Sequence, residues 1–150
     1  MNINKLNRIL IVEDNDNDLE LTLDALSEYN LANFIDVARD GEEAMHYLRK
    51  QGKFKDRENN NPVLILLDLK LPKVNGHEIL HEIRTTESLK LIPVVVLTSS
   101  KEETDIVKSY ENGVNAYVVK PVSFHDFLDA IKQLGIFWAL INESPSERKQ

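Results

Sequence analysis

Four apolar runs of this 150-residue sequence end directly at residues that could handle a phosphate group or a metal ion. The groups that follow the runs are, in chain order, Glu13-Asp14, Asp68, Thr98-Ser99 and Lys120-Pro121. Carboxylates are the hard oxygen ligands that Mg²⁺ prefers, usually one or two of them together with phosphate oxygens and water. A carboxylate can also attack phosphorus, and a nearby lysine or hydroxyl can neutralise the charge of the transferred group. The residue types therefore predict phosphoryl chemistry assisted by a divalent cation.

These groups can act together only if the apolar runs are strands of one sheet. The runs cover residues 8–12, 34–38, 63–67, 94–97 and 117–119, and segments of helical period alternate with them. Such alternation is typical of βα repeats, which form a parallel sheet with helices on both faces. The strands of this sheet would end at one edge, where such folds bind ligands. We therefore expect an α/β fold that brings three carboxylates, a hydroxyl and a lysine into one shallow crevice, with no group contributed by the run 34–38.

The helices are expected from apolar residues spaced three or four positions apart. Asp16 or Asn17 is expected to cap the first helix, and the second is expected to begin at Asp40 or Gly41. The inner faces are expected to hold Leu19, Leu23, Leu26 and Tyr29; Ala44, Met45 and Leu48; Ile79, Leu80 and Ile83; Ile106, Val107 and Tyr110; and Phe124, Phe127, Leu128, Ile131 and Leu134.

Length and composition predict one globular domain over residues 1–143, too short for a separate output domain. Within it we expect a surface-loop insertion at 51–62 and a C-terminal helix extended to about residue 142, followed by a flexible tail at 144–150. The net charge of -7 disfavours nucleic acid as a partner. No apolar run approaches the roughly 20 residues that span a bilayer, and there is no cysteine or signal-like start. A cytoplasmic location without membrane contact is the expectation.

Several motifs together resemble the receiver domain of two-component response regulators. They are Glu13-Asp14-Asn15, Leu67-Asp68-Leu69-Lys70-Leu71-Pro72, Gly76, Leu97-Thr98-Ser99 and Tyr117-Val118-Val119-Lys120-Pro121, in the family's order and spacing. The resemblance implies a flavodoxin-like, doubly wound (βα)5 fold with strand order 2-1-3-4-5. It also implies a signalling protein that accepts a phosphoryl group on an aspartate from a sensor histidine kinase and then switches partners. The protein would assist its own phosphorylation and dephosphorylation without being an enzyme of metabolism.

The resemblance further implies a role for each site residue. Asp68 would be the phosphoacceptor, and Asp14, Asp68 and the backbone carbonyl of Lys70 would bind Mg²⁺, for which Mn²⁺ can substitute. Glu13 would contribute to the metal site through water.

The remaining roles concern the phosphoryl group and the switch. Lys120, Thr98 and Ser99 would bind the phosphoryl oxygens, and Thr98 would move toward them with Tyr117 following. Gly76 would have a structural role, and the Lys120–Pro121 peptide bond would be cis.

A narrower resemblance is to the small response regulators that partner bacterial and cyanobacterial phytochromes. It depends on the insertion at 51–62, the lack of an output domain and the aromatic end at 137–142. The kinase would then be a bacteriophytochrome or phytochrome. Phe137 and Trp138 would form an interface, either for docking or for a symmetric homodimer, and the alternative is that they close the chain's own core.

Two other motifs have weaker claims to bind metal. Residues 77–81 match the zinc-protease pattern of two histidines around a glutamate, but Ile79 in the middle is expected to be core and no third ligand follows. Residues 14–18 have the alternating oxygens of a calcium loop, but Leu19 and Ala25 stand where that loop needs glycine and glutamate. We therefore expect neither a zinc nor a calcium site.

Two other functions remain as alternatives to a phosphorylated switch. One is an enzyme, a phosphatase or phosphotransferase that uses the aspartate as its nucleophile on small substrates. Such enzymes usually need a general acid and a cap that excludes water, and the sequence offers neither clearly. The other is a degenerate receiver that binds partners without phosphorylation, which the complete set of acidic and basic groups disfavours.

Overall fold

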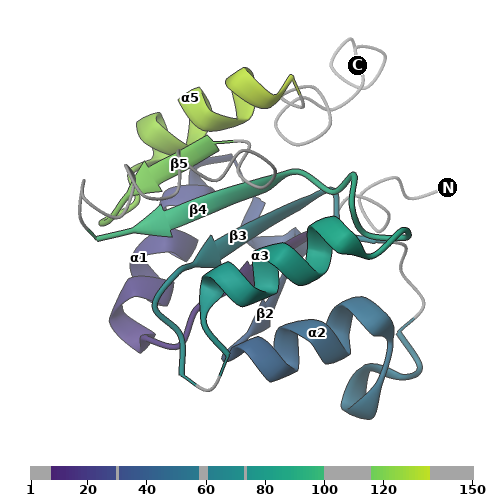
Figure 1. The fold of residues 1–150 in the computed structure, drawn as a ribbon. Coiled ribbons are helices and arrows are strands. Elements are labelled where there is room, and N and C mark those ends of the chain that lie inside the picture. Colours follow the sequence, from purple (N-terminus) through teal and green to yellow (C-terminus); the bar gives the residue numbers. More distant parts are fainter. Residues whose placement is uncertain (1–7, 30, 58–60, 73, 100–115, 136–150) are drawn as a thin grey trace, which may run out of the picture.

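The computed structural model describes residues 8–29, 31–57, 61–72, 74–99 and 116–135. Within these ranges, five parallel strands form one sheet in the order β2-β1-β3-β4-β5, as Figure 1 shows. The strands are β1 (Ile9–Val12), β2 (Ile35–Ala38), β3 (Leu64–Asp68), β4 (Val94–Thr98) and β5 (Ala116–Val119). The predicted parallel sheet and its strand order are confirmed.

Helices cover both faces of the sheet, as predicted. The α-helices are α1 (Asp16–Leu26), α2 (Gly41–Arg49), α3 (Gly76–Thr85) and α5 (Phe124–Leu134), and short 3₁₀ helices are η2 (Ser27–Tyr29), η3 (Leu31–Phe34) and η4 (Gly52–Phe54). Helices α2 and α3 pack on one face, and α1 and α5 pack on the other (Figure 1). The helix predicted around Ile106 and the aromatic pair Phe137 and Trp138 lie outside the described residues.

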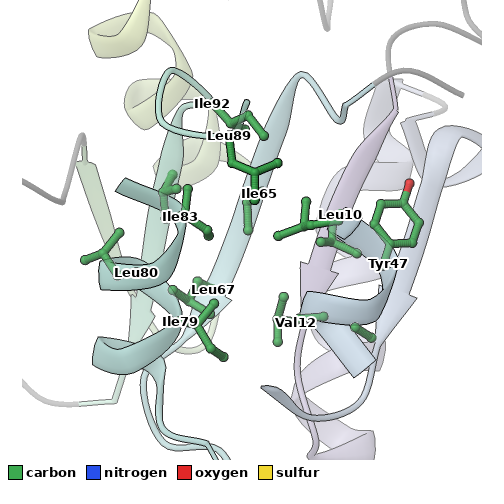
Figure 2. Packing of buried hydrophobic residues seen from close by; sticks show 14 of the residues in the cluster. Leu10, Val12, Tyr47, Ile65, Leu67, Ile79, Leu80, Ile83, Leu89 and Ile92 are labelled. Carbon is green, nitrogen blue, oxygen red and sulfur yellow. The ribbon is translucent and has the colours of Figure 1, made fainter. Parts of the chain in front are cut away.

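Two apolar layers hold the strands in place. Alternate residues of β1 point to opposite faces, so Leu10 and Val12 join the layer under α2 and α3, while Ile9 and Ile11 join the other. Figure 2 shows the first layer, in which Leu10 and Val12 lie beside residues of β3, α2 and α3. Burial of both faces explains why the strands read as unbroken apolar runs in the sequence.

Polar caps determine where the helices begin. Asn15 caps α1, and its side chain accepts a hydrogen bond from the Asp18 backbone at 2.8 Å. The prediction of Asp16 or Asn17 was therefore wrong, because both residues are already helical whereas Asn15 keeps the extended backbone that a cap requires. Asp40 caps α2, and Gly41 is the first residue of that helix.

Residues 52–57 of the insertion after α2 pack against that helix. The Phe54 ring contacts the Tyr47 ring edge-on, with ring centroids 5.2 Å apart. The Arg57 guanidinium lies 4.1 Å from the centroid of the same ring and donates two hydrogen bonds, of 3.0 and 2.8 Å, to the Tyr47 carbonyl. Tyr47, which the sequence analysis left out of the helix's inner face, is therefore the anchor of residues 52–57.

Candidate functional site

The strand register aligns the chemically important residues at one edge of the sheet. Asp68 is the last residue of β3 and Thr98 the last of β4, while Glu13 follows β1 and Lys120 follows β5. The pairs Val12–Leu67, Asp68–Leu97 and Thr98–Val119 put these ends at neighbouring positions. A backbone hydrogen bond of 2.7 Å, from the Lys120 N–H to the Thr98 carbonyl, joins the ends of β4 and β5.

Three carboxylates form an acidic cluster at this edge. Glu13, Asp14 and Asp68 each offer an oxygen, and these oxygens lie within 4.8 Å of one another. Glu13 is fully buried and Asp68 is 5% exposed, whereas Asp14 is exposed. The cluster therefore has a closed inner wall and an open side, which suits a cation that keeps part of its water shell.

The ammonium of Lys120 is bound by three carboxylates. Its Nζ lies 3.0 Å from Glu13 Oε1, 3.0 Å from Asp18 Oδ2 and 3.1 Å from Asp68 Oδ2. Burial alone would lower the pKa of Lys120, but the hydrogen bond that it donates to Asp18, the charge of Asp68 and the contacts with the Glu13 and Asp68 carboxylates raise it above its usual value. Lys120 is therefore a permanent positive charge beside Asp68.

The buried carboxylate of Glu13 lies among other acids, and this environment disfavours its ionised form. Burial, together with the hydrogen bond and charge of Asp68, raises the pKa of Glu13 to about 7, and Lys120 offsets only part of this shift. Glu13 Oε2 accepts a 3.2 Å hydrogen bond from the Asn15 backbone. Among the described residues none supplies a well-directed hydrogen bond to the buried Oε1, whose nearest charge is Lys120. A divalent cation would relieve this repulsion, so the donor set fits a bound metal.

The loop after Asp68 is shaped by a close backbone approach. The Lys70 backbone donates a 3.1 Å hydrogen bond to Asp68 Oδ1, and the Gly76 backbone donates one of 2.9 Å to the Leu69 carbonyl. A Cβ on Gly76 would lie 2.5 Å from Leu69 Cα and 2.8 Å from the Asp68 carbonyl oxygen. Only glycine allows α3 to begin this close to the phosphoacceptor candidate.

The remaining predicted residues occupy different depths. Thr98 is fully buried, Ser99 beside it is exposed, and half-buried Tyr117 packs against the apolar layer under α2 and α3. The Lys120–Pro121 peptide bond is cis. The structure thus brings Thr98 and Lys120 to the acidic edge, with Tyr117 on the neighbouring strand.

Arg39 is a site residue that the sequence analysis missed. Its Nε donates a 3.1 Å hydrogen bond to the Glu13 carbonyl, its Nη2 donates one of 3.0 Å to the Asp14 carbonyl, and it also pairs with the Asp16 carboxylate. The run 34–38 was expected to contribute no group, yet Arg39 follows it directly. The same strand-end rule would have found it if basic residues beside a cation site had been considered.

The alternative metal motifs do not assemble a second site within the described part of the chain. There, Glu13, Asp14 and Asp68 are the only group of three or more His, Cys, Asp or Glu side chains close enough to share an ion. Of the three acids in the calcium-like stretch, Asp16 is paired with Arg39 and Asp18 with Lys120, while Asp14 belongs to the acidic cluster.

Comparison with protein families now identifies the arrangement. The model of the response regulator receiver domain matches residues 9–132. The chain belongs to this family. It is a receiver domain, which is a phosphoacceptor of signalling rather than a classical enzyme, with its acidic pocket at Glu13, Asp14 and Asp68.

The receiver is similar to several curated proteins and solved structures. It is 41% identical to the response regulator Rcp1 of Synechocystis over 87% of both chains, and 40% identical to the probable methanogenesis regulatory protein FilR2 of Methanothrix harundinacea over 91% of this chain and 86% of that protein. The solved bacteriophytochrome response regulators RtBRR and AtBRR are 59% and 57% identical, each with a TM-score of 0.85. The alignments cover 96% and 92% of this chain, and 87% and 99% of those chains.

A metal is present in one related structure. Rcp1 has been solved in a Mn²⁺-bound form, at 38% identity and a TM-score of 0.70, over 92% of this chain and 96% of that one. The acidic cluster of the present receiver is able to bind a divalent metal. Among the described helices none is both long and apolar enough to cross a membrane.

Proposed function

We propose that Asp68 accepts a phosphoryl group from a phosphohistidine of a sensor histidine kinase, and that the receiver then changes its binding partners. The observation that carries this proposal is the position of Lys120 Nζ, 3.1 Å from Asp68 and 3.0 Å from Glu13 at the acidic edge. A nearly buried carboxylate with a fixed ammonium and a cation-binding cluster has all the groups that phosphoryl transfer requires.

The transfer balances as a simple displacement at phosphorus. A carboxylate oxygen of Asp68 attacks phosphorus and forms the new O–P bond, while the P–N bond to the kinase histidine breaks and the imidazole nitrogen keeps the electron pair. Lys120 donates a hydrogen bond to a phosphoryl oxygen, and Thr98 and Ser99 provide further hydroxyl donors. Hydrolysis by water breaks the O–P bond and returns inorganic phosphate and the free carboxylate.

The proposed cofactor is Mg²⁺, with Mn²⁺ able to replace it. Glu13, Asp14, Asp68 and the Lys70 carbonyl would hold it, with Glu13 acting through water. When bound, the cation neutralises charge on the phosphoryl oxygens during transfer. Arg39 keeps the Glu13 and Asp14 backbone in place through its two carbonyl hydrogen bonds.

The output is proposed to start at β4 and β5. A phosphoryl group brings up to two negative charges to a pocket in which Lys120 already contacts three acids. Thr98 would move toward the new group, and Tyr117 would follow on the adjacent strand.

The proposed kinase is a phytochrome or bacteriophytochrome, on the strength of the similarity to RtBRR, AtBRR and Rcp1. We further propose one receiver unit over residues 1–143 with a tail at 144–150, and an interface at Phe137 and Trp138 that docks a partner or forms a homodimer. We also propose that the protein acts in the cytoplasm.

Intact-mass measurement tests the phosphoacceptor. The protein is incubated with Mg²⁺ and a small acyl phosphate, alongside Asp68→Asn and the control Asp24→Asn on the exposed side of α1. We expect one labile phosphoryl adduct in the wild type and in Asp24→Asn, and none in Asp68→Asn. An adduct that survives in Asp68→Asn, or repeated turnover of many phosphate esters, would contradict the proposal.

A second experiment tests the kinase class. A phosphorylated bacteriophytochrome kinase and an unrelated phosphorylated histidine kinase are each mixed with the receiver, and loss of label from each kinase is followed. Faster transfer from the bacteriophytochrome is expected. Equal or slower transfer would overturn the phytochrome assignment and leave the phosphoacceptor role standing.

A further inference from the structure

Asp18 is a fourth acid at the pocket, and it lies outside the cluster that can share a metal. That cluster consists of Glu13, Asp14 and Asp68. Asp18 sits in the first turn of α1, where its backbone N–H is held by the Asn15 cap. Its Oδ2 nevertheless lies 3.0 Å from Lys120 Nζ, so α1 contributes directly to the position of this lysine.

Three carboxylates lie at ion-pair distance from the Lys120 ammonium, and the contact with Asp18 is a hydrogen bond of 3.0 Å. An ammonium has three hydrogens, and Glu13, Asp18 and Asp68 provide three carboxylate acceptors. A phosphoryl oxygen on Asp68 would be one more acceptor. Because Lys120 Nζ already lies at 3.0 to 3.1 Å from three carboxylates, it can approach this new acceptor only by lengthening at least one of those contacts.

Asp18 is the contact that costs least to release. Its side chain is 34% exposed, so water can solvate its carboxylate once Lys120 leaves. Glu13 is fully buried, so water could not solvate its carboxylate in place of Lys120, and Asp68 is the residue that carries the phosphoryl group. The exposed fractions therefore indicate that the Asp18–Lys120 pair is the one of the three that can be released.

We propose that Asp18 is a positioning residue, which holds Lys120 in the unphosphorylated receiver and releases it when Lys120 binds the phosphoryl group. This inference rests on the proposed function of Asp68. Because the Asp18–Lys120 pair must break, it opposes phosphoryl binding and favours the unphosphorylated state. Removing the pair should therefore strengthen binding of a phosphoryl group.

The test uses beryllofluoride, a mimic of the phosphoryl group, titrated in the presence of Mg²⁺. Asp18→Asn keeps the size of the side chain and removes its charge, and it is expected to bind the mimic roughly fivefold more tightly, as befits a partly exposed ion pair. Asp18→Glu restores a carboxylate and should return the affinity toward that of the wild type. Asp24→Asn removes a charge from the same helix without a contact to Lys120 and should leave the affinity unchanged.

Thermal unfolding without Mg²⁺ separates this role from a purely structural one. Asp18→Asn should lower the melting temperature and raise the affinity for beryllofluoride. Damage to α1 would instead lower both the melting temperature and the affinity. The proposal is overturned if Asp18→Asn binds the mimic no more tightly than the wild type, or if Asp16→Asn, in the same turn but paired with Arg39, tightens it equally.

The two proposals fail in different ways. If the wild type neither binds beryllofluoride nor gains a phosphoryl group at Asp68, the proposed function itself is wrong. If the wild type does both and Asp18→Asn shows no gain, only the role of Asp18 is lost.

Discussion

At the scale of single residues, the pocket depends on side chains that meet from distant parts of the chain. Asp14, Asp68, Thr98 and Lys120 could be predicted because each follows an apolar run, and parallel strands end at one edge. The Asp18–Lys120 pair could not, because the two residues are 102 positions apart and Asp18 reads in the sequence as an ordinary helix-start acid. Such pairings depend on how α1 is placed relative to the sheet, and the spacing of residues along the sequence does not determine that placement.

Gly76 gives the first prediction, because the backbone beside Asp68 leaves no room for a side chain. A Cβ there would lie 2.5 Å from Leu69 Cα, so Gly76→Ala should lower the free energy of unfolding by about 2 to 3 kcal/mol. Urea denaturation measures the loss.

Gly135→Ala is the matched control for Gly76→Ala. Among the residues that the structure describes, none lies within 4 Å of a Cβ at Gly135, so the cost there is expected from its φ of 73°. We expect about 1 kcal/mol for this backbone strain. Equal losses in the two variants would show that crowding beside Asp68 is not what selects glycine at position 76.

At the scale of elements, β2 and α2 are joined by a charged contact at the far side of the sheet from Lys120. Asp36 of β2 accepts hydrogen bonds from Arg8 Nε and Nη2, both at 2.9 Å, and from the Tyr47 hydroxyl of α2. Element types and order could be read from the sequence, because apolar periodicity follows the sheet and helix faces. This contact could not, since Tyr47 was not expected to face inward and Asp36 interrupts an apolar run.

Asp36 gives a prediction for the pH dependence of stability. Burial would raise the pKa of Asp36, but the hydrogen bonds from Arg8 and Tyr47 and the Arg8 charge outweigh burial and lower it. A lowered pKa means that the carboxylate stabilises the fold above its unfolded pKa of about 3.9, and that this contribution is lost as the pH falls through the folded pKa. Asp36→Asn should therefore cost about 1 to 2 kcal/mol near neutral pH, and the gap should shrink in acid.

Urea unfolding of wild type and Asp36→Asn across the acid range measures that gap. Asp24→Asn, an exposed change on α1, should alter stability little at any pH. A difference between wild type and Asp36→Asn that stays constant down to the most acidic point would rule out the ionised form as the source.

At the scale of the whole molecule, the acidic edge contains a buried carboxylate, Glu13, whose ionised form is disfavoured in the fold and would be stabilised by a bound cation. The positions of the strand ends in the sequence were enough to predict this edge. The degree to which each carboxylate is buried depends on packing instead. Glu13 is fully buried while its neighbour Asp14 is exposed, and Arg39 holds the backbone of both through hydrogen bonds to their carbonyls.

Mg²⁺ is therefore expected to stabilise the entire fold. Binding to the folded state alone adds about 2.7 kcal/mol at roughly a hundredfold excess over the dissociation constant, and the melting temperature should rise accordingly. Calorimetry with Mg²⁺ and with sodium chloride of equal ionic strength measures the specific part. Asp14→Asn, an exposed change that should fold normally, is expected to lose most of the gain; full retention would place the cation elsewhere.

The short strand β2 has a consequence for how copies of this protein behave at high concentration. It lies at one border of the sheet, has only four residues, and includes the charged Asp36. A strand from another molecule could form few backbone hydrogen bonds with this border, and it would also lie beside the charged Asp36. The border thus resists the runaway strand-by-strand growth that leads to fibrils.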